Sequence, residues 1–329
     1  MIIGIVKETT PFENRVSATP ASTKKLASQG FNIWFEKGAG TSAGFFDSEY
    51  ISAGAQIKNN SKEILQSSDI LLMLNPLQLQ KLKKSNIIIG NFQNRIPPAI
   101  FKNSTCFALE KLPRISKAQP FDILSSQNNL SGYQAIIKSA FMLKKSIPMM
   151  ITSAGTIIPT KFLILGLGVA GLQAAATAKR LGAKVYAYDI RPETKEQAQS
   201  LGAIFINDLK KILPDIDVII ASAFSSNKKA PLLIKQKDFK ILKKGTILID
   251  MAIAQGGNIE SAKNLKITKK NDCLIYANNN LANEIPQTSS QLYANNLSNF
   301  IDYLKITPDK IPSFDINDEI IKATLIQGN

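Results

Sequence analysis

The feature that most constrains the fold of this chain is the segment from Lys161 to Asp189, which reads KFLILGLGVAGLQAAATAKRLGAKVYAYD. An apolar run typical of a buried strand leads directly into Gly166, Gly168 and Gly171, and an alanine-rich stretch of helical composition follows. A second apolar run then ends at Asp189. Strand, glycine turn, helix and strand in this order predict two parallel strands joined by a helix.

Each glycine of this G-x-G-x-x-G turn has a physical role in binding a dinucleotide. Gly166 permits the tight turn, Gly168 lets the backbone approach a pyrophosphate, and Gly171 lets the helix pack closely against the strand. The helix N-terminus then offers unpaired N–H groups and a positive dipole end to the phosphates. The alternative is that the glycines serve packing alone, but strand, turn and helix together favour the dinucleotide site.

Asp189 ends the strand that follows the glycine turn. A carboxylate at this point can accept hydrogen bonds from the adenine ribose of NAD and repel the 2′-phosphate of NADP. Arg191, two residues later, is instead suited to bind a 2′-phosphate. The sequence therefore favours NAD and leaves NADP as the alternative.

The composition is typical of a globular protein of two domains. The chain has 329 residues, of which 44% are hydrophobic and 20% charged, enough to bury a core in each domain. The formal net charge is +15, but the lysines are scattered in pairs without an aromatic-interleaved basic stripe. We therefore expect no nucleic-acid partner.

Neither a metal site nor a membrane span is predicted. Cys106 and Cys273 are the only cysteines and lie far apart, which fits a reducing compartment and suggests neither a disulfide framework nor a zinc site. The chain begins MIIGIVKE, like a first strand rather than a cleavable leader. Lys161 is the only charge between Lys145 and Lys179, but prolines and glycines interrupt this stretch, so we interpret it as buried strand and helix.

Hydrophobic periodicity divides the chain into two α/β series. The first has strands at 2–6 and 31–36, a helix at 20–29, and a pattern that continues through 64–66, 70–74 and 87–90. The second has strands at 161–166, 184–189, 203–206, 217–221, 246–250 and 273–276, and helices at 169–181, 192–200 and 235–242. Repeated units of this kind indicate parallel, doubly wound sheets.

Long helices predicted at 126–145 and 289–304 can carry the chain between the two domains. We therefore expect one domain of 1–125 plus 289–329 and an NAD(H)-binding domain of 126–288. The predicted fold is α/β, with two Rossmann-like domains that have parallel sheets, are joined by long helices and leave a cleft between them.

A second group of polar residues precedes the first long helix. The segment 112–127, LPRISKAQPFDILSSQ, contains Arg114, Gln119, Asp122 and Ser125. These residues can form a solvated loop with a helix cap, or they can face the nicotinamide end of a dinucleotide. Spacing alone leaves both interpretations open.

Two runs of the sequence resemble the NAD(H)-binding domain of proton-translocating NAD(P) transhydrogenase, which is the soluble part of its α subunit. They are RISKAQPFDILSSQNNLSGYQAI, and the run from PMMITSAGT through the glycine turn to EQAQSLGA. KETTPFENRVSATP and ILIDMAIAQGGN fit both this family and alanine dehydrogenase, a relative with the same fold. The resemblance runs from residue 1 to about 304, and the loop with Arg114, Gln119 and Asp122 belongs to the transhydrogenase side.

The resemblance implies a role for each matching position. Arg114, Gln119 and Asp122, with Ser125 beside them, are implied to be the catalytic residues that hold and orient the nicotinamide ring and its ribose. The glycine turn is implied to bind the pyrophosphate, Asp189 and Arg191 the adenosine end, and Ser222 a further part of the nucleotide. The implied cofactor-binding residues are Arg114, Ile115, Ser116, Gln119, Asp122, Gly166, Leu167, Gly168, Val169, Gly171, Asp189, Ile190, Arg191 and Ser222.

The resemblance also implies partners. The family's soluble domain is a homodimer that binds NAD(H) and docks on a membrane-embedded proton-channel subunit and an NADP(H)-binding subunit. This implies a cytoplasmic protein, peripheral on the inner membrane through its partners, that passes hydride from NADH to NADP⁺ with coupled proton translocation. The sequence contains no histidine, which suits this reaction because hydride transfer between two nicotinamides moves no proton at the reacting carbons.

Two other functions stay open. Alanine dehydrogenases use a histidine and a lysine in the first domain, where this chain offers Asn75, Asn91 and Gln93; Arg15 remains to bind a carboxylate, without a base. The second alternative is a non-catalytic NAD-binding regulatory subunit. The family's mobile loop, which closes over bound nucleotide, has no room after Ile206, and a missing lid predicts looser closure.

Overall fold

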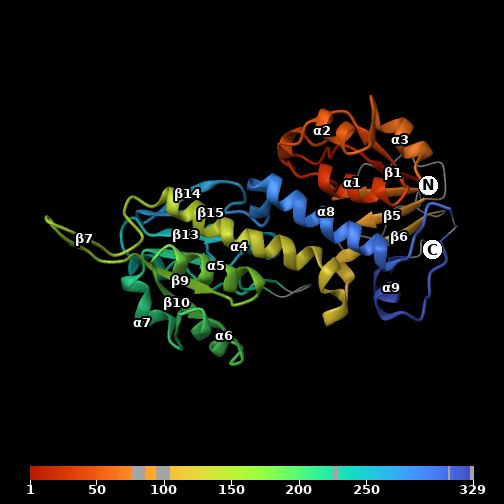
Figure 1. The fold of residues 1–329 in the computed structure, drawn as a ribbon. Helices are drawn as coiled ribbons and strands as arrows, with labels where there is room; N and C mark the ends of the chain where they lie inside the picture. Colours follow the sequence, from red (N-terminus) through yellow and green to blue (C-terminus); the bar gives the residue numbers. More distant parts are fainter. Residues whose placement is uncertain (76–85, 94–103, 225–228, 310–311, 327–329) are drawn as a thin grey trace. The chain divides into compact units, whose positions relative to one another are not determined.

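A computed structural model describes residues 1–75, 86–93, 104–224, 229–309 and 312–326 of the chain. The chain forms two compact units: unit 1 comprises Met1–Gln127 and Asn283–Asn329, and unit 2 comprises Asn128–Ala282. Within the described residues each unit has one seven-stranded, mostly parallel sheet with helices packed on it (Figure 1). The predicted α/β fold with two Rossmann-like halves is therefore confirmed.

The sheet of unit 1 has the strand order β16-β6-β5-β4-β1-β2-β3. Its strands are β1 (Ile2–Ile5), β2 (Asn32–Glu36), β3 (Ala55–Lys58), β4 (Ile70–Met73), β5 (Ile87–Gly90), β6 (Thr105–Ala108) and β16 (Leu325–Ile326). Among the described strands only the β16–β6 pair is antiparallel. All residues of β4 and β5 are buried, which explains their continuous apolar sequences.

The helices of unit 1 pack around an aromatic-rich core. They are α1 (Pro20–Ser28), α2 (Asp47–Ser52), α3 (Ser61–Ser67), α8 (Pro286–Tyr303) and α9 (Glu319–Thr324). Thr19 caps α1 by accepting a hydrogen bond from the Ser22 N–H, and Pro20 occupies the first helical position. Tyr293 and Phe300 of α8 are fully buried, so the C-terminal segment of the chain completes the core begun by the N-terminal strands.

The sheet of unit 2 has the order β11-β10-β9-β12-β13-β15-β14. Its strands are β9 (Lys161–Leu165), β10 (Lys184–Tyr188), β11 (Ile204–Phe205), β12 (Val218–Ala221), β13 (Ile247–Asp250), β14 (Ile267–Lys270) and β15 (Cys273–Ala277). The chain proceeds from β9 outward to β10 and β11, and then crosses to β12 on the other side of β9. This is the doubly wound order of a dinucleotide-binding domain.

Three helices of unit 2 follow predicted positions or fill connections: α5 (Val169–Arg180), α6 (Thr194–Ser200) and α7 (Leu209–Ile212). The helix predicted at 235–242 is wrong, because only a 3₁₀ turn, Asp238–Lys240, forms there. The Asp238 carboxylate accepts a hydrogen bond from the Lys235 N–H at 2.8 Å. Such a side-chain bond satisfies the local backbone without a helix.

The long helix α4 (Ile123–Met142) begins three residues before its predicted start and links the two units along the chain. A two-stranded hairpin, β7 (Met150–Thr152) and β8 (Gly155–Ile157), follows it. The apolar stretch between Lys145 and Lys179 forms this hairpin, β9 and most of α5. Across the described ranges, no helix is both long and apolar enough to cross a membrane.

Candidate functional site

The glycine turn lies at the carboxyl end of β9, where the strand order of unit 2 reverses. β10 pairs with β9 on one side and β12 on the other. In open parallel sheets, ligands bind at such a switch point. Gly166 has a φ of +88°, a left-handed conformation that favours glycine.

The three glycines differ in what surrounds them. A Cβ on Gly166 would lie 2.7 Å from the backbone of Ala223, and a Cβ on Gly171 would lie 1.8 Å from the Gly166 carbonyl oxygen. A Cβ on Gly168 would meet none of the described atoms within 4 Å. Packing within the chain therefore explains Gly166 and Gly171, whereas the space at Gly168 fits the close approach of a pyrophosphate.

The N-terminus of α5 supports the same interpretation. Gly168 occupies the N-cap position, and no side-chain hydrogen bond caps the helix. The first-turn N–H groups and the helix dipole can therefore serve an anion instead of a cap. The residues present fit a dinucleotide pyrophosphate at this turn.

Asp189 is tied to the glycine turn. Its side chain is 6% exposed, and Oδ2 accepts a hydrogen bond from the Leu167 N–H at 2.6 Å. Arg191 donates to Oδ1 from its backbone N–H at 2.9 Å and contacts both carboxylate oxygens with its guanidinium, at 3.0 and 2.9 Å. Burial raises the pKa of Asp189, but the hydrogen bonds from Arg191 and Leu167 outweigh burial and hold this pKa below its ordinary value.

This ion pair bears on the choice between NAD and NADP. Four N–H groups already donate to the two oxygens of Asp189, which is about the accepting capacity of a carboxylate. Ribose hydroxyls would therefore have to displace the Arg191 guanidinium, whose side chain is 48% exposed and held by a weak surface-type pair. The same guanidinium neutralises the carboxylate charge that would repel a 2′-phosphate.

Apolar side chains surround the turn. Ile190, which follows Asp189, is 85% exposed, and Val169 and Phe224 are also exposed. Exposed apolar groups beside a phosphate-binding turn suit the flat face of a base. The Ser222 hydroxyl donates to the Gly166 carbonyl at 3.1 Å, so it braces the turn; its predicted contact with the nucleotide stays a prediction. Phe224 was not predicted from the sequence.

The loop 114–122 of unit 1 presents its polar residues to solvent. Its 3₁₀ turn, Ser116–Phe121, buries Ala118 and Phe121, while Ile115 packs against the core. Arg114, Ser116 and Gln119 are exposed. The apolar residues therefore anchor the loop and leave the exposed side chains available to a ligand.

Asp122 and Ser125 form a helix cap. The Asp122 carboxylate accepts hydrogen bonds from the Ser125 N–H at 2.8 Å and from the Ser125 hydroxyl at 2.6 Å. This is the capping arrangement that stabilises the first turn of α4. Contact with a nicotinamide stays a prediction for the whole loop, and the exposure of Arg114 and Gln119 favours these two.

A buried ionic cluster, which was not predicted from the sequence, lies near the carboxyl ends of β1 and β4. The Arg15 guanidinium contacts both carboxylate oxygens of Glu13 at 2.7 Å and donates to Gln127 Oε1 at 2.8 Å. Both side chains are almost fully buried. A substrate carboxylate would have to compete with Glu13 for Arg15.

Glu8 gives this cluster a titrating group. Its carboxylate accepts hydrogen bonds from the Leu74 N–H at 2.7 Å and from Asn75 Nδ2 at 3.3 Å. Burial, aided by the nearby charge of Glu13, raises the pKa of Glu8 to about 7. No base was predicted in this domain, and two acidic residues that follow the end of the first strand are the signal that could have revealed one.

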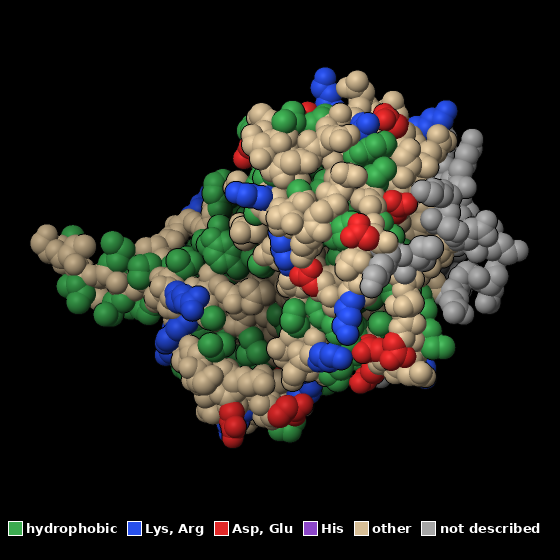
Figure 2. Space-filling model, turned by 45° about the vertical axis from the view of Figure 1, so that its right-hand side comes forward, with side chains coloured by type: hydrophobic (Ala, Val, Ile, Leu, Met, Phe, Trp, Pro, Cys, Tyr) green, Lys and Arg blue, Asp and Glu red, His purple; other side chains and the backbone are tan. Residues whose placement is uncertain are grey.

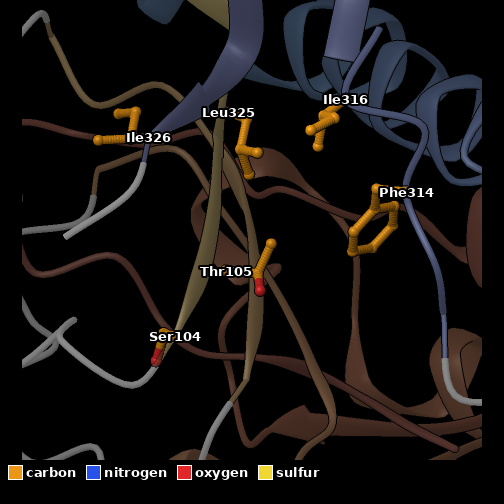
Figure 3. A pocket seen from close by; sticks show the side chains of 6 residues that line it. All are labelled: Ser104, Thr105, Phe314, Ile316, Leu325 and Ile326. Carbon is orange, nitrogen blue, oxygen red and sulfur yellow. The ribbon is translucent and has the colours of Figure 1, made fainter. Parts of the chain in front are cut away.

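A small cavity of about 200 Å³ also opens in unit 1, beside β6 and β16 (Figure 3). Its lining is mostly apolar: Ser104, Thr105, Phe314, Ile316, Leu325 and Ile326. None of these belongs to the predicted site. Within the described residues, no group of three or more His, Cys, Asp or Glu side chains could hold a metal ion.

Models of two protein-family domains match the chain. Alanine dehydrogenase/PNT, N-terminal domain, matches residues 4–131, and Alanine dehydrogenase/PNT, C-terminal domain, matches residues 135–329. The chain belongs to the alanine dehydrogenase/PNT family.

Within this family the chain is similar to transhydrogenase subunits. The first portion of the NAD(P) transhydrogenase subunit alpha of Rickettsia prowazekii (strain Madrid E) is 37% identical over 365 residues, which cover 99% of this chain and 94% of the relative. The corresponding protein from Rhodospirillum rubrum is 35% identical, with 99% and 96% covered. An alanine dehydrogenase of Methanococcus maripaludis is 27% identical, with 90% and 85% covered. The predicted resemblance to the transhydrogenase α subunit is confirmed.

Solved structures of the family agree. A transhydrogenase from Sinorhizobium meliloti has a TM-score of 0.91 and 36% identity, and the match covers 99% of this chain and 98% of that one. An L-alanine dehydrogenase with a TM-score of 0.80 and 23% identity, covering 93% and 90%, shares the fold. The alignment with the Rickettsia relative is longer than the 329 residues of this chain, so that relative has residues without a counterpart here. Their position after Ile206 stays a prediction.

Proposed function

We propose that this family member is the NAD(H)-binding subunit of a proton-translocating NAD(P) transhydrogenase. The observation that carries the proposal is the open space at Gly168, between two glycines that internal packing requires. Relatives named as NAD(P) transhydrogenase subunit alpha, which align over 99% of the chain, support it. NADP(H) and the proton pathway are assigned to partner subunits, the latter embedded in the membrane.

Each segment of the proposed site has one task. The turn from Gly166 to Gly171 binds the pyrophosphate, Asp189 and Arg191 bind the adenosine end, and the exposed side chains of loop 114–122 orient the nicotinamide. Bound NADH supplies a hydride from its dihydronicotinamide ring. The chain's residues need only bind, orient and exclude water, because no proton moves at the reacting carbons.

The test is an assay with the membrane partner subunits. We expect NADH to reduce an NADP⁺ analogue only when this chain and its partners are mixed. Tight NADH binding without any such reduction would favour the non-catalytic regulatory subunit instead.

The Glu8–Glu13–Arg15 cluster favours one alternative, an alanine-dehydrogenase-like oxidoreductase, because it holds a titrating carboxyl beside an arginine. The isolated chain would then oxidise NADH in the presence of ammonia and pyruvate. We expect no such turnover, since Arg15 is already paired with Glu13 on both carboxylate oxygens.

Replacing Gln119 by leucine is expected to slow hydride transfer in the reconstituted complex. Gln119 is exposed on a loop held by buried neighbours, so leucine removes its amide without disturbing the packing. NADH affinity is expected to stay within about tenfold of the wild type, or about 1.4 kcal/mol, because most contacts lie elsewhere. An unchanged transfer rate in stopped-flow measurements would reject the ring-orienting role.

The β7–β8 hairpin supports the proposed homodimer. It projects from unit 2, and Figure 2 shows green side chains along it. Every residue of both strands is exposed, with Ile151 at 75%. Among the described strands, β7 and β8 pair only with each other, so each keeps a free edge, and such apolar edges invite pairing. A two-fold dimer would cover the same surface on both copies.

Replacing Ile151 by aspartate is therefore expected to convert the dimer to a monomer at micromolar concentration while leaving the thermal unfolding of the monomer unchanged. Light scattering after gel filtration measures the mass. Replacing Ile51, an exposed isoleucine of α2, by aspartate is the matched control and is expected to stay dimeric. A wild-type chain that is monomeric at this concentration would contradict the dimer.

A further inference from the structure

We propose that Asn296 of α8 is a positioning residue that holds the backbone beside Gln119 in place. The inference rests on the proposed function, since it takes loop 114–122 to orient the nicotinamide. Nothing in the family resemblance points to Asn296; the proposal comes from its contacts. All of these contacts lie within unit 1.

Both ends of the Asn296 amide are engaged. Nδ2 donates to the Pro120 carbonyl at 2.8 Å, and Oδ1 accepts from the Ser126 hydroxyl at 2.7 Å. The side chain is buried, as Asn296 is only 8% exposed. One amide therefore joins the loop to the first turns of α4.

The Pro120 carbonyl depends on α8 for its position. Proline has no N–H, so its carbonyl is the only backbone group at this residue that can form a hydrogen bond. Asn299, three residues after Asn296, also donates to this oxygen, at 3.4 Å. A partly buried carbonyl that loses its donor is costly, so the backbone next to Gln119 is expected to shift when Asn296 is changed.

Aromatic packing holds the next residue of the loop. The Phe121 ring lies 5.7 Å from the Phe300 ring and 4.9 Å from the Tyr303 ring, measured between centroids. Residues 296, 299, 300 and 303 share one face of α8 by helical spacing. This face therefore fixes the loop through two amides and two rings, directly after Gln119.

The function of such a support is geometric. Misplacing a reacting group by about 1 Å can slow a reaction about a hundredfold. Binding affinity depends less on the exact position of one loop, because the pyrophosphate turn is expected to supply much of it. A change at Asn296 should therefore affect the orientation of the nicotinamide and the transfer rate more than NADH affinity.

The test is Asn296→Asp, with Asn295→Asp as the matched control. Aspartate has nearly the same shape as asparagine and can still accept from Ser126, but it places an oxygen against the Pro120 carbonyl. Asn295 is exposed on the same helix, so its variant carries the same charge change without these contacts.

Three readouts are expected to change together in Asn296→Asp and not in Asn295→Asp. Amide hydrogen exchange in residues 115–122 becomes faster, and the anisotropy of bound NADH fluorescence decays faster because the ring moves more. Hydride transfer to an NADP⁺ analogue in the reconstituted complex slows at least about tenfold. The Kd for NADH changes by less than about threefold.

The outcomes separate this inference from the proposed function. If Gln119→Leu slows transfer but Asn296→Asp matches the Asn295→Asp control in all three readouts, the positioning role is overturned and the function stands. If neither variant slows transfer, the nicotinamide-orienting role of the loop fails first. Should Asn296→Asp not fold, Ser126→Ala removes one of the two hydrogen bonds without adding charge, and unchanged exchange and anisotropy there would overturn the proposal.

Discussion

Replacement of Gly168 by alanine is expected to leave unit 2 folded and to weaken NADH binding at least about tenfold, or about 1.4 kcal/mol. The added methyl group would meet no described protein atom within 4 Å, so the fold has no reason to change. Gly168 also has a φ of −78°, which alanine adopts without strain. The methyl group would instead occupy the space through which the backbone approaches a pyrophosphate.

Gly171→Ala is the contrasting variant. Its Cβ would lie 1.8 Å from the Gly166 carbonyl oxygen, a distance that requires the turn or the helix to move. We expect a loss of several kcal/mol in the free energy of unfolding, within the range of severe overpacking. Urea unfolding and fluorescence titration with NADH measure both variants. Full NADH affinity in a folded Gly168→Ala protein would reject the dinucleotide site at this turn.

Much of unit 2 could be predicted because its signals are local. The residues of β12 and β13 are all buried, so their strands have continuous apolar sequences. The glycine turn, its strand and its helix are adjacent in the chain, and the structure has them in the predicted order. The hydrogen bond from Leu167 to Asp189 joins two segments of the same β-α-β unit.

The remaining features depend on contacts that sequence order does not reveal. Pro120 and Asn296 are separated by 176 residues, so the support of loop 114–122 by α8 has no local pattern. The guanidinium of Arg191 covers Asp189, although the two residue types at this spacing equally permit separate roles. Likewise, the capping role of Asp122 and its role toward a ligand share one sequence.

The ionic cluster was missed for the same reason. Glu8, Glu13 and Arg15 are close in the sequence, but their burial depends on Asn75 and Gln127, which come from distant segments. A carboxyl near a strand end is usually exposed, and only the folded chain reveals the desolvation that raises the pKa of Glu8.

Replacing Glu8 by glutamine is expected to change how the stability of the protein depends on pH. Burial raises the pKa of Glu8 from 4.5 to about 7 in the folded state. Between these values the folded chain binds more protons than the unfolded chain, so this group's contribution to the free energy of unfolding falls as pH rises. The contribution is complete below pH 4.5 and lost as pH rises through about 7, with a total of about 2–3 kcal/mol.

Glutamine removes this dependence because it does not titrate. It also loses the acceptor that Glu8 offers to Asn75 Nδ2, a cost of about 1 kcal/mol that does not vary with pH. The informative quantity is therefore the difference in unfolding free energy between Glu8→Gln and wild type. That difference is expected to move in favour of the variant by about 2 kcal/mol between about pH 5 and pH 8.

Urea titrations at a series of pH values measure this difference, with Glu196→Gln, an exposed glutamate on α6, as the control. Glu13, Asp189, Asp217 and Asp318 have lowered pKa values, so each of them loses stabilisation as pH falls. Their effects are common to wild type and variant and cancel in the difference. Parallel pH profiles for wild type and Glu8→Gln would show that Glu8 does not hold its proton near neutrality, and the cluster would then lack the proton acceptor that amino-acid oxidation requires.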